Sequence, residues 1–182
     1  VVEPLDAEKI YVHQPGVLQT VHAQTGSHVE AGESIATLVD EDLAVSVETL
    51  KVSRARAKAE LESFSLQEGK ISDASRRINA ATVELAEIER QLEIRQRMLD
   101  QLDLKASRGG TLILPPNILA PPLVESDRTL ARWTGTPLDA DNRNCFLEKQ
   151  TLVCLVGDPH QMRARLMVDQ SDAKQISVGQ AV

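Results

Sequence analysis

Residues 43–64 read LAVSVETLKVSRARAKAELESF. Apolar residues in this segment recur at alternating steps of four and three, which is the spacing of a helix that buries a narrow seam against another helix. Arg54 is the one polar residue on the seam. The apolar seam residues are Leu43, Val47, Leu50, Ala57, Leu61 and Phe64. We therefore predict an amphipathic helix of about 25 residues that pairs with a second helix.

The same spacing returns over residues 78–102, which predicts the second helix. The polar run 68–73 joins the two, and Gly69 in it suits the left-handed residue that ends a helix, while Ser72 or Asp73 suits an N-cap. A connection this short predicts antiparallel helices. We take the run as the tip of the hairpin and as a candidate interaction site, formed by Glu68, Gly69, Lys70, Ile71, Ser72 and Asp73.

One fold-back point brings every pair of seam residues into register. In each facing pair the two position numbers sum to 145 or 146, as an antiparallel hairpin with one turn requires. The pairs are Val47 with Leu99, Leu50 with Arg95, Ala57 with Ile88, Leu61 with Leu85, and Phe64 with Ala81. We expect the two seam arginines to lay their methylene groups along the seam and to carry their guanidinium groups out to acidic partners.

A second apolar series lies off the seam of the first helix at steps of seven, at Val45, Val52, Ala59 and Leu66. Ile94 and Met98 lie off the seam of the second helix. One interpretation is a widened core stripe, which ordinary helices have. The other is lateral contact with a neighbouring protomer, because a two-helix hairpin buries only one face of each helix.

The chain repeats itself on the two sides of the hairpin. Short β-branched runs with glycine turns are typical of small strands, and 104–112 matches 10–18 at an offset of 94. Segment 147–158 matches 29–40 at an offset of 118, so the second half holds an insertion of 24 residues within 115–144. Two Pro-Pro pairs in the insertion favour irregular, extended backbone.

The insertion carries Trp133, the only tryptophan in a chain with 2% aromatic residues. Tryptophan is enriched at interfaces because its large, stiff side chain buries much area. One hypothesis makes the insertion a docking or shielding element on the β module. The other makes it a surface loop whose Trp133 packs back on the module as a local plug.

Charge and hydropathy disfavour several classes of function. Twenty Lys and Arg against 27 Asp and Glu give a net charge of −7, so DNA or RNA would meet a repulsive field. No run approaches the roughly 20 apolar residues of a membrane-spanning helix, and no basic-then-apolar leader opens the chain. The chain begins without Met and stops just after Gly179-Gln180, which resembles a turn, so we expect it to be part of a longer protein.

The sequence shows no catalytic or metal-binding constellation. Its four histidines lack the Cys-x-x-Cys and His-x-x-x-His spacings of metal sites, and no nucleophile with its base or paired carboxylates stand out. These histidines are His13, His22, His28 and His160. We therefore expect no cofactor, no metal and no enzymatic activity.

Cys145 and Cys154 flank a predicted β-hairpin with its turn near Lys149-Gln150. A symmetric hairpin places the two cysteines opposite each other across its strands. An envelope location would permit a disulfide there, but cross-strand neighbours often have poor geometry for one. We predict two separate thiols.

The order of these elements resembles that of the HlyD family of periplasmic adaptors, also called membrane fusion proteins. The resemblance rests on Pro15 to Leu18, Gly26 to Val29, Ala31-Gly32 and Ile35 to Leu43, and on Leu104 to Leu112, Leu152 to Pro159 and Leu166 to Gly179. It implies an α+β fold. A lipoyl-like (biotinyl/lipoyl) β-sandwich over 1–42 and 103–160 is interrupted by an antiparallel coiled-coil helical hairpin over 43–102. The start of a β-barrel domain follows over 161–182.

The resemblance also implies a non-enzymatic adaptor of the cell envelope, in which sandwiches pack in a ring and the hairpin reaches toward an outer-membrane duct. An inner-membrane transporter is the implied partner, the full-length protein is implied to be a homo-oligomer, and a segment outside this sequence anchors it to the inner membrane. One branch of the family has a docking signature that consists of an Arg, a Leu four residues after it and a Ser eleven residues after it. The first helix lacks it, so a duct of that type is in doubt.

Two other classes of function share parts of this pattern. Lipoyl and biotinyl carrier domains need a lysine that can be acylated between the two repeated halves. Residues 38–43, which lie at this point of the chain, read LVDEDL and contain no lysine. A carrier role is therefore disfavoured. The alternative that stays open is an envelope scaffold or regulatory subunit that holds an inner-membrane enzyme, such as a protease, without an export role.

The prediction of separate thiols is tested by measuring the intact mass of the purified chain with and without reductant. We expect the same mass in both, because cross-strand geometry disfavours the bond. A shift of two protons would establish the disulfide instead.

Overall fold

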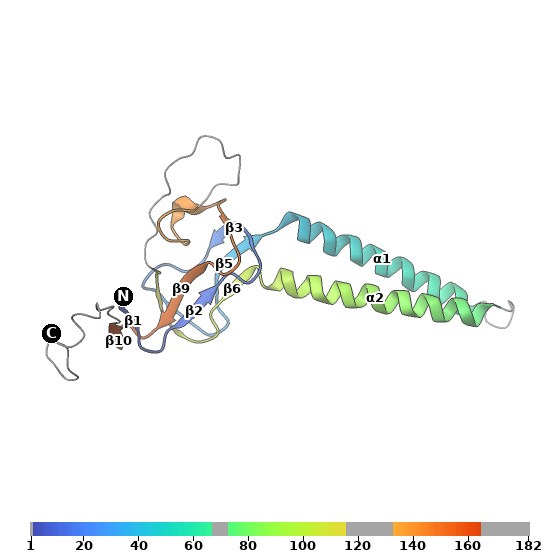
Figure 1. Ribbon diagram of the computed structural model, residues 1–182, viewed down its shortest axis with the longest axis horizontal. Helices are drawn as coiled ribbons and strands as arrows, with labels where there is room; N and C mark the ends of the chain where they lie inside the picture. The colour runs from blue at the N-terminus through green and yellow to red at the C-terminus, as the bar shows by residue number, and fades with distance from the viewer. Residues whose placement is uncertain (1, 67–72, 116–132, 165–182) are drawn as a thin grey trace, which may run out of the picture.

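The computed structural model describes residues 2–66, 73–115 and 133–164, and it confirms the predicted α+β class (Figure 1). A β-sandwich is interrupted by an antiparallel helical hairpin, α1 (Glu41–Leu66) and α2 (Ala74–Asp100). The hairpin projects from one side of the sandwich. A separate pair of short strands, β1 (Val2–Pro4) and β10 (Met162–Ala164), lies on the opposite side (Figure 1).

The sandwich consists of two antiparallel sheets of four strands each. The first sheet has the order β2 (Glu8–Tyr11), β9 (Leu152–Gly157), β7 (Gly110–Ile113), β4 (His28–Val29). The second has the order β6 (Asp103–Lys105), β5 (Ser34–Val39), β3 (Gly16–Val21), β8 (Phe146–Leu147). Each sheet therefore takes strands from both sides of the hairpin.

The sequence repeat relates the two sheets strand for strand. Leu18 pairs with Leu38 in the second sheet, and the residues at offsets 94 and 118, Leu112 and Val156, pair in the first. The edge pairs obey the same offsets: Gly16 pairs with Leu147, and Gly110 pairs with Val29. The repeat thus fixes the pairing register as well as the location of the strands.

The core of the sandwich is aliphatic, as the low aromatic content requires. Strand residues facing inward from both sheets are fully buried, because alternate side chains of a strand point to the same face. Fully buried examples are Leu18, Ile35, Leu112, Leu147, Val153 and Val156. Leu43 and Leu102, at the two roots of the hairpin, join the same cluster. The hairpin is therefore packed onto the core at its base.

The two helices meet along the predicted seam. Val47, Ala57 and Ala81 are buried, with exposed fractions of 1%, 6% and 7%. Asp40 caps α1, because its Oδ1 accepts a hydrogen bond of 3.0 Å from the Leu43 N–H. Glu41 and Asp42 in the first turn add a favourable interaction with the helix dipole.

The two seam arginines behave differently. Arg54 follows the prediction, since its Nε lies 3.7 Å from the Glu89 Oε1 of the other helix. Arg95 is exposed and its Nη1 contacts the Sδ of Met98 at 4.0 Å. The expected acidic partner of Arg95 is therefore replaced by a thioether one turn further along the same helix.

The predicted hairpin between Cys145 and Cys154 is wrong. β8 pairs with β3 in one sheet, whereas β9 pairs with β2 and β7 in the other. The connection between them crosses from sheet to sheet, with Gln150 at a φ of 67°. The repeat explains this, because β4 and β5 in the first half also belong to different sheets. Both cysteines are free thiols, as predicted.

β1 was not predicted from the sequence, because three residues carry no periodic signal and their partner strand is about 160 residues away. The predicted strand from Met162 to Val168 is present as β10 up to Ala164. Residues 165–182, which include the predicted short helix Ser171 to Ile176, lie outside the described residues.

The close approach of backbones at two equivalent glycines gives a test of this fold. A Cβ added to Gly110 would lie 3.0 Å from both Gly157 N and Val156 Cγ1, and one added to Gly16 would lie 2.9 Å from Val39 O. We expect Gly110→Ala to lower the free energy of unfolding by about 1–3 kcal/mol through overpacking. The measurement is urea denaturation followed by circular dichroism.

Gly109→Ala is the matched control, because its Cβ would lie 3.5 Å from the nearest atom, Val29 O. We expect a change within about 0.5 kcal/mol. Equal stability of the two variants would contradict the strand packing described above.

Candidate interaction surfaces

The hairpin tip is described only at its C-terminal end. Glu68, Gly69, Lys70, Ile71 and Ser72 lie outside the described residues, so their role stays a prediction. Asp73 precedes α2, but its side chain makes no capping hydrogen bond. Its backbone, at φ −111° and ψ 7°, is not in the extended conformation of an N-cap, and its Oδ1 lies 3.5 Å from Arg76 Nε instead. The predicted capping by Asp73 is therefore wrong.

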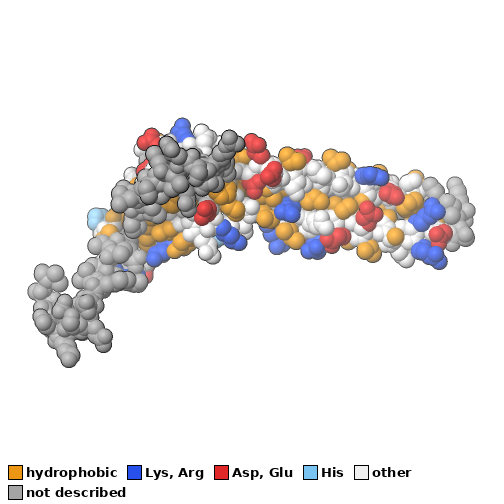
Figure 2. Space-filling view, turned by 45° about the horizontal axis from the view of Figure 1, so that its top comes forward, with side chains coloured by type: hydrophobic (Ala, Val, Ile, Leu, Met, Phe, Trp, Pro, Cys, Tyr) orange, Lys and Arg blue, Asp and Glu red, His pale blue; other side chains and the backbone are white. Residues whose placement is uncertain are grey.

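The outer face of α1 exposes an apolar stripe, which we define as Val45, Val52, Ala59 and Leu66. Val45, Val52 and Leu66 are 66%, 70% and 81% exposed. Val45 lies two residues from each of its neighbouring seam residues, Leu43 and Val47. Two residues correspond to about 200° of rotation around the helix, so Val45 points away from α2, and the rest of the stripe, at steps of seven, does the same. Hydrophobic side chains are visible along the length of the hairpin in Figure 2. For α1, the interpretation as a widened core stripe is therefore wrong.

The outer face of α2 carries a shorter apolar group, formed by Ala80, Val83 and Ile94. Val83 is 70% exposed and Ile94 is 43% exposed. Val83 was missed in the sequence, although it too lies two residues from a seam position, Leu85. Met98 does not belong to this face, because it is half-buried and packs against the core.

Charged pairs occupy the rest of the outer face of α2. Arg90 donates two hydrogen bonds to Glu87, at 2.8 and 3.0 Å, and Arg97 is paired with Glu93. Hydrogen bonds from Arg90 and then from Gln91 lower the pKa of Glu87 to about 2. These pairs lie within one helix and are exposed, so each contributes little to stability. The face is well solvated but not strongly charged.

Trp133 is half-buried and packs against the core of the sandwich. This is the arrangement of the plug hypothesis, and a docking role of Trp133 stays a prediction. The described part of the insertion, 133–144, is folded around Asn142, which is 3% exposed. The Asn142 Nδ2 donates to Thr134 O and Thr136 O at 2.7 and 2.6 Å, and its Oδ1 accepts from Thr134 N at 3.1 Å.

A second set of hydrogen bonds closes the same loop. Thr136 donates from its hydroxyl and from its N–H to the carboxylate of Asp139, at 2.7 and 2.8 Å. These two bonds lower the pKa of Asp139 below its ordinary value. Asn144 N then donates to Leu18 O, and Leu18 N donates to Cys145 O, both at 2.9 Å. The loop is thereby fastened to β3.

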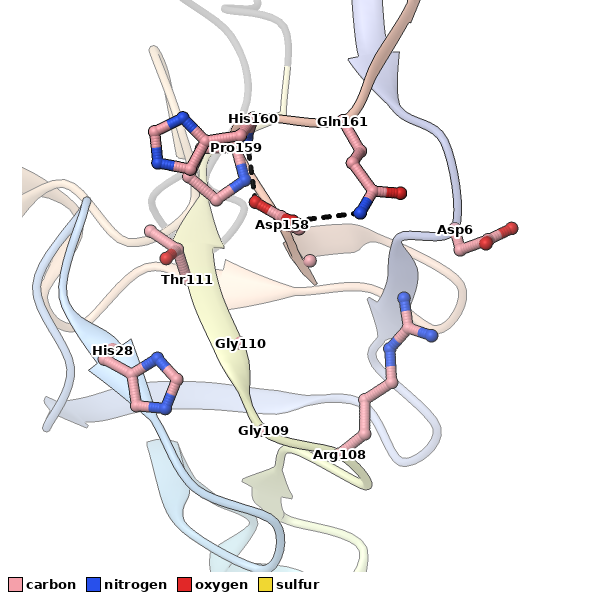
Figure 3. Close-up of a pocket in the computed structure, with 11 residues that line it drawn as sticks. Asp6, His28, Arg108, Gly109, Gly110, Thr111, Asp158, Pro159, His160 and Gln161 are labelled. Atoms are coloured by element: carbon pink, nitrogen blue, oxygen red, sulfur yellow. Dashed lines mark hydrogen bonds between the residues drawn. The ribbon is translucent and has the colours of Figure 1, made fainter.

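Two hollows on the sandwich are equivalent by the repeat. One lies at the root of the hairpin and includes Gly16, Val39 and Asp40. The other, shown in Figure 3, includes Gly110 and Asp158. The two aspartates also act alike: Asp158 Oδ1 accepts a hydrogen bond of 2.9 Å from His160 N. Asp40 thus begins the hairpin and Asp158 begins the connection to β10.

The hollow of Figure 3 was not predicted as a site. His28 and Arg108 flank β7 from opposite sides, and His160 lies beyond its end. Arg108 also contributes to the fold, because its Nη2 donates a hydrogen bond of 3.4 Å to Val156 O. Across the described parts of the chain, no group of three or more His, Cys, Asp or Glu residues could hold a metal ion.

The two thiols are not placed for chemistry. Cys145 and Cys154 are both buried, and burial raises the pKa of Cys154 to about 12, with a smaller effect of Glu8. A thiol with this pKa is protonated at neutral pH and is a poor nucleophile. Of the helices in the described residues, neither α1 nor α2 has the length of apolar sequence needed to cross a membrane.

No protein-family model matches this chain, and its sequence matches none of the curated proteins. Solved structures do match. A MacA–MexA chimera that contains the hairpin domain of MexA from Pseudomonas aeruginosa superimposes with a TM-score of 0.66 at 12% identity, over 95% of this chain and 55% of the chimera. The membrane fusion protein Spr0693 from Streptococcus pneumoniae gives 0.58 at 14% identity, over 98% of this chain and 71% of that one.

A protein of Bacteroides eggerthii assigned as an efflux transporter gives a TM-score of 0.60 at 16% identity, over 86% of this chain. This chain spans 41% of that protein's length. The chain therefore has the fold of the membrane fusion, or periplasmic adaptor, proteins. The resemblance drawn from the sequence is confirmed at the level of the fold.

The buried amide of Asn142 gives a test of the described part of the insertion. Asn142→Ala leaves Thr134 and Thr136 backbone groups without partners, so we expect a loss of about 2–3 kcal/mol and release of the loop. Emission of Trp133 should shift to the red while far-ultraviolet circular dichroism is retained. Asn79→Ala, at an exposed site on α2, is the control and should leave the emission unchanged. An unshifted spectrum for Asn142→Ala would contradict the plug arrangement.

Proposed function

We propose that this chain is the core of a periplasmic adaptor in an export or efflux assembly of the cell envelope. In this role it links an inner-membrane transporter to an outer-membrane component and does no chemistry itself. The observation that supports the proposal most is the shape of the molecule. A rigid sandwich holds a long hairpin on one side and the β1–β10 pair on the other (Figure 1).

The root of the hairpin is held so that the hairpin and the sandwich move together, as an adaptor between two partners requires. α1 leaves from β5 and α2 returns into β6, and these two strands pair directly, Ala36 with Leu104 and Thr37 with Asp103. Leu38 N also donates to Leu102 O at 2.8 Å. Movement of the hairpin root therefore requires movement of the sheet, because both ends are hydrogen-bonded to it.

The surface chemistry agrees with a binding role. Exposed apolar side chains on a hairpin that the sandwich does not cover are unfavourable in water unless a partner covers them. Burial raises the pKa of the Cys154 thiol, which makes that thiol a poor nucleophile. We propose that the full-length protein is a homo-oligomer, anchored to the inner membrane through a segment outside this sequence. The shared fold of membrane fusion proteins supports each of these proposals.

The test is co-purification of the tagged full-length protein from cross-linked cells. Leu61 is a half-buried seam residue, and Leu61→Asp places a charge in the seam and weakens the hairpin. We expect wild type to recover both an inner-membrane transporter and an outer-membrane component. Leu61→Asp should recover the transporter at a normal level and the outer-membrane component at least about tenfold less.

Leu61→Met is the matched control, because it keeps the seam apolar and nearly preserves its volume. It should behave as wild type. Recovery of an inner-membrane enzyme such as a protease, with no transporter, would replace the export role by the scaffold alternative.

A further inference from the structure

We propose that Met98, at the root of the hairpin, is a site of oxidation to methionine sulfoxide, and that Arg95 binds the sulfoxide oxygen and keeps the root packed. The oxidants are peroxides. The inference goes beyond the proposed function and does not depend on it, because it concerns one thioether and one guanidinium group within this chain.

Arg95 interrupts the apolar seam at a place where its own helix offers it no acidic partner. Acidic residues stabilise a helical arginine from positions three or four residues away. In α2, Arg90 is paired with Glu87 in this way. The four corresponding positions around Arg95 hold Gln91, Leu92, Met98 and Leu99. None of these four is acidic, so an ion pair within the helix does not explain Arg95.

Arg95 makes its side-chain contact with sulfur. Its Nη1 lies 4.0 Å from the Sδ of Met98, and the arginine is exposed. A thioether sulfur is a weak hydrogen-bond acceptor, so this contact contributes little to stability while the methionine is reduced. The contact does, however, hold a charged donor beside the sulfur atom.

Met98 lies where the core and the solvent meet. It is half-buried, and it packs against the core of the sandwich together with its neighbour Leu99. Leu43 and Leu102, at the two roots of the hairpin, belong to the same core. A half-buried thioether is accessible to a small oxidant. A polar group formed there lies within the packing that joins the hairpin to the sandwich.

The reaction is the transfer of one oxygen atom. A lone pair of the Met98 sulfur attacks one oxygen of hydrogen peroxide, so that an S–O bond forms as the O–O bond breaks. The leaving hydroxide takes the proton of the transferred oxygen and departs as water, and the sulfur is oxidised by two electrons. The product is polar and chiral where the thioether was apolar, and reductases that are each specific for one epimer reverse the reaction.

The sulfoxide oxygen is a strong acceptor for Arg95. This oxygen carries partial negative charge, and a hydrogen bond to it from a guanidinium group is roughly twice as strong as one between neutral groups. A polar oxygen in contact with the core and without a donor would destabilise the hairpin root. Arg95 therefore offsets the destabilising effect of oxidation, and Met98 remains packed against the core.

The experiment compares the melting temperature of the full-length protein before and after treatment with hydrogen peroxide, followed by the helical circular dichroism signal. Mass spectrometry of peptide 71–105, released by cleavage after lysine, detects the added oxygen, because Met98 is the only methionine in that peptide. We expect oxidation to lower the melting temperature of wild type by less than about 2 °C and that of Arg95→Gln by at least about 5 °C. Arg95 is exposed, so the reduced variant should fold normally.

Two control variants separate this pair from other effects of the oxidant. Arg90→Gln removes an arginine of the same helix about two turns from Met98, and oxidation should affect it no more than wild type. Met98→Leu keeps the apolar packing, and its shift, which reports oxidation elsewhere, is subtracted from the others. Equal losses in wild type and Arg95→Gln would overturn the role of Arg95. Folded protein that gains no oxygen at Met98 would overturn the site itself.

The stereochemistry of the product gives a second measurement, which a general effect on stability would not change. Core packing and Arg95 make the two sides of the Met98 sulfur unequal, so one epimer should form at least about 80% of the sulfoxide, and one of the two epimer-specific reductases should remove it from peptide 71–105. Protein oxidised in urea is the control and should give both epimers in similar amounts. Similar amounts from the folded protein would contradict a fixed oxygen beside Arg95.

Discussion

The pairing of β5 with β6 is the constraint on which the rest of the structure depends. These strands lie at the two ends of the hairpin, and their hydrogen bonds hold its two roots at the strand spacing of about 4.8 Å. Packed helices lie about 8–10 Å apart, so the helices must diverge as they leave the sheet. Leu43 and Leu102 fill the space at this point and join the hairpin to the core. The direction of the arm is therefore set by the sheet and not by the helices.

Because of the internal repeat, the chain leaves the sandwich at two equivalent positions, and a different structure follows each of them. Asp40 and Asp158 occupy matching positions and each accepts a hydrogen bond from a backbone N–H two or three residues further on. After Asp40 the chain enters α1, whereas after Asp158 it crosses to β10. A duplicated module thus holds an arm at one end and a connection at the other. Its glycines, Gly16 and Gly110, keep neighbouring strands close in both halves.

The outer faces of the hairpin have unequal chemistry. α1 exposes an apolar stripe, while α2 exposes arginines that are paired with acidic residues of the same helix. The hairpin therefore presents an apolar surface on α1 and a mainly polar surface on α2. In the described part of the insertion, Asn142 closes the loop through hydrogen bonds within it, and Trp133 packs against the core of the sandwich.

Periodicity and repetition in the sequence determined the helical hairpin, its seam and the strand offsets, because these depend on spacing along the chain, as the burial of Val47 and Ala57 on the seam shows. The same spacing located the apolar stripe that includes Val52 but did not show whether it is buried. A core stripe and an exposed stripe have the same spacing along the chain. Tertiary structure alone decided three points. β1 has three residues and so carries no periodic signal. β8 has two residues, and its pairing with β3 in the same sheet joins distant parts of the chain. Asp73 does not cap α2, because its backbone conformation is not extended.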